Sequence, residues 1–334
     1  MIDDFIQSIQ INKYEFSKAG SAEYVLNKYM NNSWPIVYII KNDKLKEAYI
    51  GESTNAINRM KNHLANTERQ RLNDVLIISC DKFNKSAVLD IESNLIQYMS
   101  SDGVYALQNG NAGLVDHNYY QREQYKALFK KVWEHLRTEN YAKNDLLRID
   151  NSDLFKYSPY KSLSTDQHDS VLKILSLLTK KEENTIFVEG GAGTGKTILA
   201  IYMMKLLQTN LQDYHIDEED EVYSNELAQI VKLKEKFPNP RIALVVPMTS
   251  LRKTLKKVFG HVKGLKGSMV IGPSEVAKNE YDVLIVDEAH RLRKRKNITN
   301  YKSFDDANKL LGFDIHEGTE LDWILKQSKN QIFF

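Results

Sequence analysis

The chain has 334 residues and a formal net charge of +2, with 27% charged and 42% hydrophobic residues. This balance excludes a disordered chain and a uniformly basic nucleic-acid binder, so any site for a polyanion must be local. At ~150 residues per domain, the length predicts two domains. The single cysteine, Cys80, excludes a disulfide framework, and no apolar run reaches the ~18 residues of a membrane span. We therefore expect a soluble cytoplasmic protein that does not contact a membrane.

The first element in chain order is a hairpin predicted over residues 34–53, "WPIVYIIKNDKLKEAYIGES". Two apolar runs flank the turn sequence "KNDK", and each run carries one tyrosine, Tyr38 and Tyr49. The second run continues directly into Ile50 and Gly51. Because tyrosine suits any half-buried strand, the hairpin alone is equally consistent with an ordinary small antiparallel sheet.

Two predicted helices follow the hairpin. The segment "ESTNAINRMKNHL" places Arg59 and His63 four residues apart, and therefore on one helix face. The segment "AVLDIESNLIQYM" places one carboxylate, Glu92, among apolar neighbours. The glycine- and asparagine-rich stretch at 106–118 predicts a loop that closes this first domain.

A change of pattern marks the second half of the chain. Apolar residues at helical spacing predict an amphipathic connecting helix in "YYQREQYKALFKKVWEHLRTEN". The strand-like runs "TIFVEGG", "IALVVP" and "YDVLIVDEAH" then alternate with helical segments, which is typical of a parallel sheet covered by helices. The acidic insert at 215–222 is predicted to be a solvated surface loop. The predicted fold is α/β: a small mixed α+β domain over 1–116, a helical linker over 117–150 and a P-loop parallel-sheet domain over 151–334.

A phosphate-binding loop is predicted at "GGAGTGKT", which fits the pattern G-x-x-x-x-G-K-[ST] between a strand and a helix. Glycines let successive backbone N–H groups point at phosphate oxygens, at the positive end of the following helix. Lys196 would meet the β- and γ-phosphates of ATP, and the Thr197 hydroxyl would ligate Mg²⁺. The predicted nucleotide-binding residues of the loop are Gly190, Gly191, Ala192, Gly193, Thr194, Gly195, Lys196 and Thr197.

The run "VLIVDEAH" supplies the carboxylates that such a loop needs for hydrolysis. Asp287 is expected to hold the magnesium ion, and Glu288 to orient or deprotonate the attacking water. His290 either senses the γ-phosphate or is an ordinary loop histidine. Upstream, the amide of Gln167 could pair with adenine, because amides can read adenine through two hydrogen bonds.

These motifs carry a specific resemblance over residues 150–334. Gln167, "GGAGTGKT", "VVPMTSLRKTL" and "DEAH" resemble the first RecA-like domain of a superfamily-one helicase, and more narrowly that of the Schlafen-like helicase-ATPases of bacteria. The resemblance implies that the run ending in "IFF" is a sheet strand, and that a second RecA-like domain with an arginine finger comes later. We expect that domain to be absent here, so that either the chain is a fragment or a second copy or partner chain supplies the other half of the motor.

The N-terminal residues resemble a second family, the GIY-YIG nucleases, over about residues 30–113. The tyrosine spacing (49 − 38 = 11) fits and "YIG" is intact, whereas the first triplet is "IVY", with Ile36 where the family often has glycine. The resemblance implies that Glu92 is the sole protein ligand of one Mg²⁺ or Mn²⁺ ion and that the arginine holds the scissile phosphate. It also implies that Tyr38 or Tyr49 deprotonates water, and that His63 supports the tyrosines or shuttles a proton. Asn109 falls where the family ends its core.

Two basic stretches, at 252–266 and 290–302, predict contacts with a nucleic-acid backbone, although a solvated loop is also consistent with each. Together the motifs favour a metal-dependent endonuclease coupled to an ATPase, acting on DNA rather than RNA in a bacterial anti-phage or restriction-like defence role. Two alternatives remain open. Nucleotide binding could gate cleavage without unwinding, or the chain could bind nucleic acid without catalysis.

Overall fold

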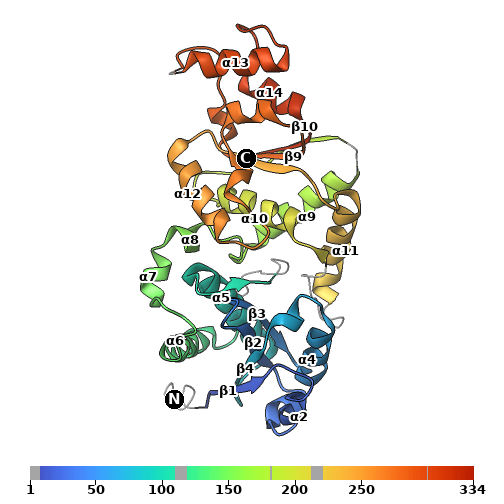
Figure 1. Ribbon diagram of the computed structural model, residues 1–334, viewed down its shortest axis with the longest axis vertical. Coiled ribbons are helices and arrows are strands. Elements are labelled where there is room, and N and C mark those ends of the chain that lie inside the picture. Colours follow the sequence, from blue (N-terminus) through green and yellow to red (C-terminus); the bar gives the residue numbers. More distant parts are fainter. Residues whose placement is uncertain (1–7, 110–118, 181–182, 212–220, 299) are drawn as a thin grey trace. The chain divides into compact units, whose positions relative to one another are not determined.

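The computed structural model describes residues 8–109, 119–180, 183–211, 221–298 and 300–334, with side chains from Leu227 onward in the fourth range. These residues form two compact units. Residues 8–109, 119–156 and Tyr160–Ser162 make up unit 1, and Tyr157–Pro159 and Leu163–Phe334 make up unit 2. Each unit has its own sheet (Figure 1). The predicted fold class, a small mixed α+β domain before a parallel-sheet domain, is confirmed.

The sheet of unit 1 contains the predicted tyrosine hairpin. Its strands are β1 (Gln10–Glu15), β2 (Ile36–Asn42), β3 (Glu47–Ser53), β4 (Asp74–Ser79) and β5 (Ala106–Leu107). Their spatial order is β1-β4-β2-β3-β5, and every pairing is antiparallel except the parallel one between β3 and β5. The turn forms because Oδ1 of Asn42 accepts hydrogen bonds from the backbone N–H groups of Lys44 and Leu45.

Both helices predicted after the hairpin are present, as α4 and α5. Each begins at an asparagine, Asn55 or Asn84, whose side chain accepts a backbone N–H of the first turn, and α5 ends at Gly103 in the left-handed conformation. The helices of unit 1 are α2 (Ser21–Tyr24), α3 (Lys28–Asn31), α4 (Ala56–Ala65), η1 (Arg69–Arg71), α5 (Lys85–Asp102), α6 (Arg122–Thr138), α7 (Leu146–Asp150) and α8 (Asp153–Lys156).

The amphipathic helix predicted after residue 118 is α6, and all of its predicted apolar positions are buried. It packs against α5 through the ring of Tyr98, which also contacts α8. The ring of Tyr98 lies 5.3 Å from that of Phe129, 5.7 Å from that of Trp133 and 4.7 Å from that of Phe155. The segment expected to be a linker therefore contributes to the packing of unit 1.

The sheet of unit 2 is parallel throughout, as the strand and helix alternation predicts. Its strands are β6 (Asn184–Phe187), β7 (Ile242–Val245), β8 (Val270–Ile271), β9 (Tyr281–Val286) and β10 (Ser328–Phe333), in the order β6-β10-β9-β7-β8. The "IFF" run is thus a strand, as expected, and it lies between β6, which precedes the phosphate loop, and β9, which precedes Asp287.

The helices of unit 2 are α9 (Thr165–Lys180), α10 (Lys196–Gln208), α11 (Glu221–Lys236), α12 (Thr249–Gly260), η3 (Gly267–Met269), η4 (Pro273–Lys278), η5 (Ala289–Arg291), α13 (Tyr301–Leu311) and α14 (Glu320–Gln327). In Figure 1, α13 and α14 lie together beyond β9 and β10. Most of the acidic insert, residues 215–220, lies outside the described residues, as does the stretch 110–118 of the predicted closing loop.

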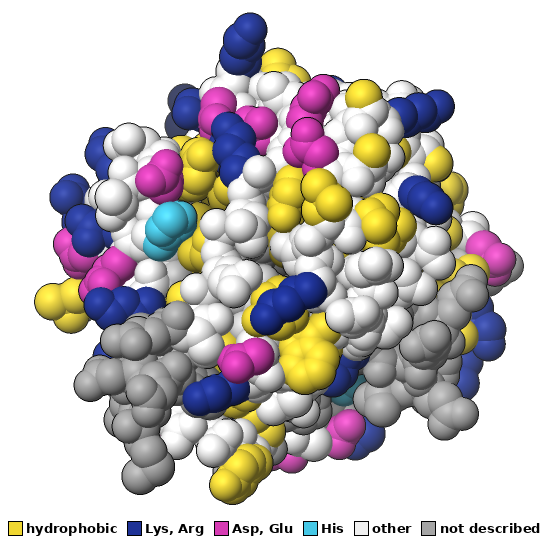
Figure 2. All heavy atoms as spheres, turned by 90° about the horizontal axis from the view of Figure 1, so that it is seen from below, with side chains coloured by type: hydrophobic (Ala, Val, Ile, Leu, Met, Phe, Trp, Pro, Cys, Tyr) yellow, Lys and Arg dark blue, Asp and Glu magenta, His cyan; other side chains and the backbone are white. Residues whose placement is uncertain are grey.

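Charge is mixed on the visible surface. On the face shown in Figure 2, lysine and arginine side chains are interspersed with acidic and hydrophobic ones, in keeping with the small net charge of +2. Within the described residues, no helix combines the length and the apolar character needed to cross a bilayer.

Candidate active sites

The two tyrosines of the hairpin lie on one face of the sheet. Tyr38 is paired directly with Gly51, and Ile40 with Tyr49, so the two phenols are diagonal neighbours with ring centres 6.3 Å apart. Gly51 is needed for this arrangement. A Cβ at residue 51 would lie 2.2 Å from the Tyr38 hydroxyl oxygen and 2.4 Å from the ring carbon that bears it.

Helix α4 brings two more predicted residues to the Tyr38 hydroxyl. His63 Nε2 lies 2.7 Å from this oxygen, and Arg59 Nε donates to it over 3.2 Å. Both reach the same atom because residues four apart lie on one face of a helix. His63 is buried, with 1% of its surface exposed.

Sequence reasoning missed one member of this site, Arg69 from η1. It is 2% exposed, its Nη1 donates to Nδ1 of His63 over 2.9 Å, and its guanidinium carbon lies 3.8 Å above the centre of the Tyr49 ring. In "TERQRLN" this arginine is indistinguishable from surface charge, so the sequence offers no signal for it.

The electrostatics of the site link both phenols to Glu92 on α5. Burial raises the pKa of Tyr38 well above its ordinary value. The charge of Tyr49 raises it further, and Arg59 lowers it. Burial also raises the pKa of Tyr49, and Arg69 and Arg59 partly offset this. The charge of the Glu92 carboxylate raises the pKa of both phenols. Contacts thus join four of the five residues predicted for this site, Tyr38, Tyr49, Arg59 and His63, and the charge of the fifth, Glu92, acts on both phenols.

The donor set fits a hard divalent cation. Among the residues that the structure describes, no three His, Cys, Asp or Glu side chains form a cluster that could hold a metal. Near the phenols, Glu92 instead offers a single carboxylate. Such a site suits Mg²⁺, which keeps several waters and is often bound through one or two carboxylates and phosphate oxygens.

Asn109 holds the "YIG" strand from its edge. Its side-chain oxygen accepts the Ile50 N–H over 3.1 Å and its side-chain nitrogen donates to the Ile50 carbonyl over 2.7 Å. The amide therefore fills the place of a strand partner beside the two hairpin tyrosines, which gives the predicted core-ending asparagine a definite structural role.

The phosphate loop in unit 2 has the expected conformation. Gly193 and Gly195 have positive φ angles of 78° and 82°, which L-residues rarely adopt. The Lys196 ammonium donates to the carbonyls of Gly190 and Gly191, over 2.6 and 2.9 Å. The lysine thus lies across the loop at the N-terminus of α10, with its charge where phosphate is predicted to bind.

The two predicted magnesium ligands of unit 2 are in contact. The Thr197 hydroxyl donates to Asp287 Oδ2 over 2.9 Å, although the residues are 90 positions apart. Burial raises the pKa of Asp287, and the bond from Thr197 lowers it. A buried carboxylate beside a hydroxyl is a donor set that fits Mg²⁺.

Glu288 has strained backbone, as residues at functional sites often do. Its φ is 55°, and its Oε2 lies 3.2 Å from Arg291 Nε and 3.3 Å from His290 Nε2. The predicted catalytic carboxylate is thus held by side chains two and three positions after it. Sensing of the γ-phosphate by His290 stays a prediction.

Gln167 is joined to the phosphate loop. Its Oε1 accepts the Ser164 N–H over 3.0 Å and its Nε2 donates to the Thr194 carbonyl over 2.8 Å. A Cβ at residue 195 would lie 2.4 Å from this nitrogen. The amide therefore braces the loop, and recognition of adenine by Gln167 stays a prediction.

The basic segment after Glu288 divides into paired arginines and exposed lysines. Arg293 donates to the buried Glu320 on α14, and Arg295 forms a two-bond pair with Asp305 on α13 at 2.6 and 2.9 Å. Lys294 and Lys296 are exposed, without an ion pair in the described part of the chain. The two arginines therefore hold the segment against α14 and α13, and the two lysines remain exposed for other contacts.

The geometry defines a chain with buried phenols and cations clustered on a hairpin in one unit, and a glycine-rich loop that fits the phosphate-binding pattern on a parallel sheet in the other. Comparison with known families agrees. The family model of the GIY-YIG catalytic domain matches residues 35–105, and that of the Schlafen group 3, DNA/RNA helicase domain matches residues 183–334. The chain is a fusion of these two domains, which confirms both resemblances found in the sequence. No curated protein matches the chain.

Proposed function

We propose that the chain is a divalent-metal-dependent endonuclease, coupled to an ATP-hydrolysing helicase-like domain and acting on DNA. The observation that carries the proposal is the convergence of His63 and Arg59 on the hydroxyl of Tyr38, within the field of Glu92. A phenol, an arginine and one carboxylate are the groups that metal-assisted phosphodiester hydrolysis requires.

Each residue of the nuclease site has a role that its surroundings support. Arg59 and Arg69 place positive charge beside the phenols, which favours the phenolate that a base requires. Tyr38 and Tyr49 both remain candidates for the base that activates water, and Arg59 would also hold the scissile phosphate. Glu92 would hold Mg²⁺ or Mn²⁺, which supplies Lewis-acid stabilisation of the leaving oxygen.

In unit 2, Lys196 would exchange its two carbonyl partners for the β- and γ-phosphates of ATP. Thr197 and Asp287 would hold Mg²⁺ from their present positions, and Glu288 would orient or deprotonate water. We infer a defence role against foreign DNA, because an ATPase fused to a nuclease suits a restriction-like system.

The test is cleavage of single- and double-stranded DNA and RNA by the purified chain, with and without Mg²⁺. We expect Mg²⁺-dependent cutting of DNA, lowered about 10²- to 10⁴-fold by Glu92→Gln with ATP hydrolysis unchanged. Glu123→Gln, an exposed change whose glutamate pairs only with Lys126 among the described residues, is the matched control. Cleavage by Glu92→Gln at the wild-type rate contradicts the assignment.

A further inference from the structure

Arg69 constrains the protonation of His63. A guanidinium has five N–H donors and no acceptor, so the 2.9 Å contact between Arg69 Nη1 and His63 Nδ1 requires Nδ1 to accept. A neutral imidazole with an accepting Nδ1 carries its proton on Nε2. The imidazolium form would set N–H against N–H and one cation against another, and is therefore disfavoured.

The other ring nitrogen faces the phenol. His63 Nε2 lies 2.7 Å from Tyr38 Oη, and in this tautomer it donates to that oxygen. Arg59 Nε donates to the same oxygen over 3.2 Å. Two N–H groups thus converge on Tyr38 Oη, so the phenol cannot pass its own proton to His63. The histidine stabilises negative charge on the oxygen instead of shuttling a proton.

The position of Arg69 is set by the chain around it. Asn66, which ends α4, accepts the backbone N–H groups of Glu68 and Arg69 through Oδ1, over 3.0 and 3.3 Å. This turn places Arg69 so that its guanidinium lies over the Tyr49 ring, and the residue is 2% exposed. A buried, stacked guanidinium has few alternative places, so it can hold the imidazole in one state.

We propose that Arg69 is a positioning residue of the nuclease site, which holds His63 in the Nε2-protonated tautomer so that His63 donates to Tyr38. The inference rests on the proposed nuclease function for its consequence in catalysis. The tautomer itself is independent of that function, and the two can therefore be tested separately.

The first experiment reads the tautomer in the full chain, labelled with [¹⁵N]histidine and assigned by comparison with His63→Gln. We expect nitrogen chemical shifts of a neutral ring with a bare Nδ1 and a protonated Nε2. Arg69→Met, which removes the donor, should give a mixture of tautomers, and Arg69→Lys, which restores a donor, should return the wild-type pattern. A protonated Nδ1 in the wild type, or an unchanged ring in Arg69→Met, overturns the proposal.

The second experiment measures cleavage kinetics. Arg69→Met should lower kcat about 10- to 100-fold with little change in KM, in the range found when the partner that orients a functional histidine is removed. His63→Gln should retain more activity than His63→Ala, because the glutamine amide can still donate to Tyr38. In the His63→Gln background, Arg69→Met should lower kcat less than it does in the wild type, because no imidazole is left to hold.

Equal kcat for His63→Gln and His63→Ala would point to proton transfer through the ring and contradict the proposal. ATP binding and the melting temperature are measured for each variant. If Arg69→Met melts at a lower temperature than the wild type, the kcat of Arg69→Lys is the decisive comparison. If the wild-type chain cuts no nucleic acid, the proposed function fails, and the tautomer experiment still decides the role of Arg69.

Discussion

The hydroxyl of Tyr38 occupies the space that any side chain at residue 51 would need. A Cβ there would lie within 2.8 Å of three atoms of the phenol, none of which can move without breaking the contacts to His63 and Arg59. Glycine at this position is therefore a packing requirement of the site.

Gly51→Ala should destabilise unit 1 by about 1–3 kcal/mol and displace Tyr38, because overpacking forces side chains from their preferred positions. Urea unfolding and the cleavage rate measure the two effects. Gly260→Ala, at the end of α12 with open space around its Cβ, is the control and should change stability by less than about 1 kcal/mol. Unchanged cleavage by Gly51→Ala would mean that the position of Tyr38 does not matter.

At the scale of single residues, the sequence could predict those that follow one another in the order known from a family. Tyr38, Tyr49, Arg59, His63 and Glu92 are each ordinary alone, and their order predicted the set that the structure brings together. Arg69 could not be predicted, because its role comes from a tertiary contact with His63 and not from a pattern along the chain. The brace between Gln167 and Thr194 escaped prediction for the same reason.

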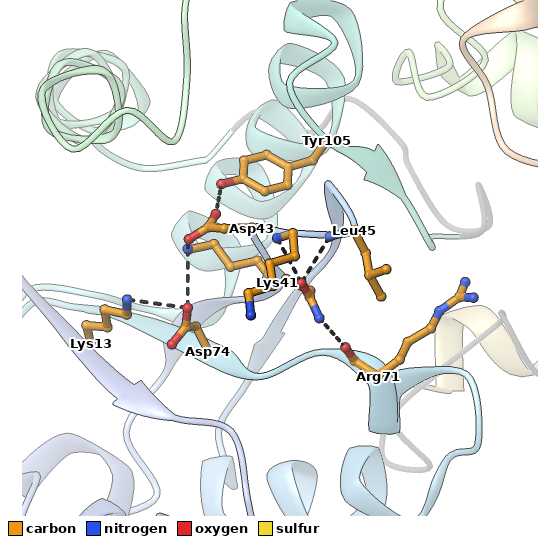
Figure 3. A network of polar contacts seen from close by, with 9 residues as sticks. Lys13, Lys41, Asp43, Leu45, Arg71, Asp74 and Tyr105 are labelled. Carbon is orange, nitrogen blue, oxygen red and sulfur yellow. Dashed lines mark hydrogen bonds and ion pairs between the residues drawn. The ribbon is translucent and has the colours of Figure 1, made fainter.

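The closed end of the β2–β3 hairpin contains a buried cation. Lys41 is fully buried, and its ammonium lies 2.6 Å from Asp43 and 3.6 Å from Asp74, which also pairs with Lys13 (Figure 3). Tyr105 donates to Asp43, and the ring of Tyr141 lies 4.0 Å from the lysine nitrogen. The network fastens three strands of unit 1 to the segment after α6.

Removing the two carboxylates should lower the free energy of unfolding more than removing the lysine does. The double change Asp43→Asn and Asp74→Asn leaves a buried charge without its acidic partners, which costs about 3–5 kcal/mol. Lys41→Met should lower the free energy of unfolding by less. The side chains of Asp43 and Asp74 are 44% and 21% exposed, so both carboxylates stay hydrated without the lysine. Urea unfolding of each variant measures the difference, and the reverse order would contradict the interpretation.

The same network predicts a sensitivity to acid. Burial alone would raise the pKa of Asp43, but hydrogen bonds from Lys41 and Tyr105 outweigh it and hold the pKa below 3.8. Asp43 therefore contributes stability above this pH, and the contribution is lost as the pH falls through the lowered pKa. The difference in unfolding free energy between wild type and Asp43→Asn should shrink on acidification. A difference that is constant with pH would refute this.

The segment after β9 makes a prediction for nucleic-acid binding. Lys294→Gln with Lys296→Gln should weaken binding to duplex DNA of any sequence and reduce the salt slope by about 1 per lysine. Lys173→Gln with Lys180→Gln on α9 is the matched control, and fluorescence anisotropy across a salt series is the measurement. An unchanged salt slope would mean that the two lysines make no contact with DNA phosphates.

Two chemical sites in one chain raise the question of how they communicate. We expect ATP to stimulate cleavage by the wild-type chain, and Lys196→Ala to abolish ATP binding and this stimulation together, since Lys196 is the predicted contact to the phosphates. Lys173→Ala serves as the control. Cleavage at one rate with and without ATP would mean that the two domains act independently.

Across the whole molecule, local sequence patterns predicted the helices and strands. Contacts between elements distant in the sequence determined which unit each element belongs to and which charges are paired. The runs predicted as strands contain most of β6, all of β7 and all of β9, and α6 buries every predicted apolar position. The assignment of α6 to α8 to unit 1 depended on the rings around Tyr98, which no spacing reveals. Likewise, the arginines after Glu288 met acids up to 27 residues away, which periodicity does not show.

The place of β10 between β6 and β9 has a consequence during translation. The strand before the phosphate loop and the strand before Asp287 both pair with β10, which is synthesised after them, and Asn330 follows its partner Asn184 by 146 positions. At synthesis rates of about 5–20 residues per second, β6 and the loop after it wait roughly 7–30 s for the neighbouring strand of the finished sheet. The nuclease unit, whose strands all precede residue 108, can meanwhile complete its own sheet.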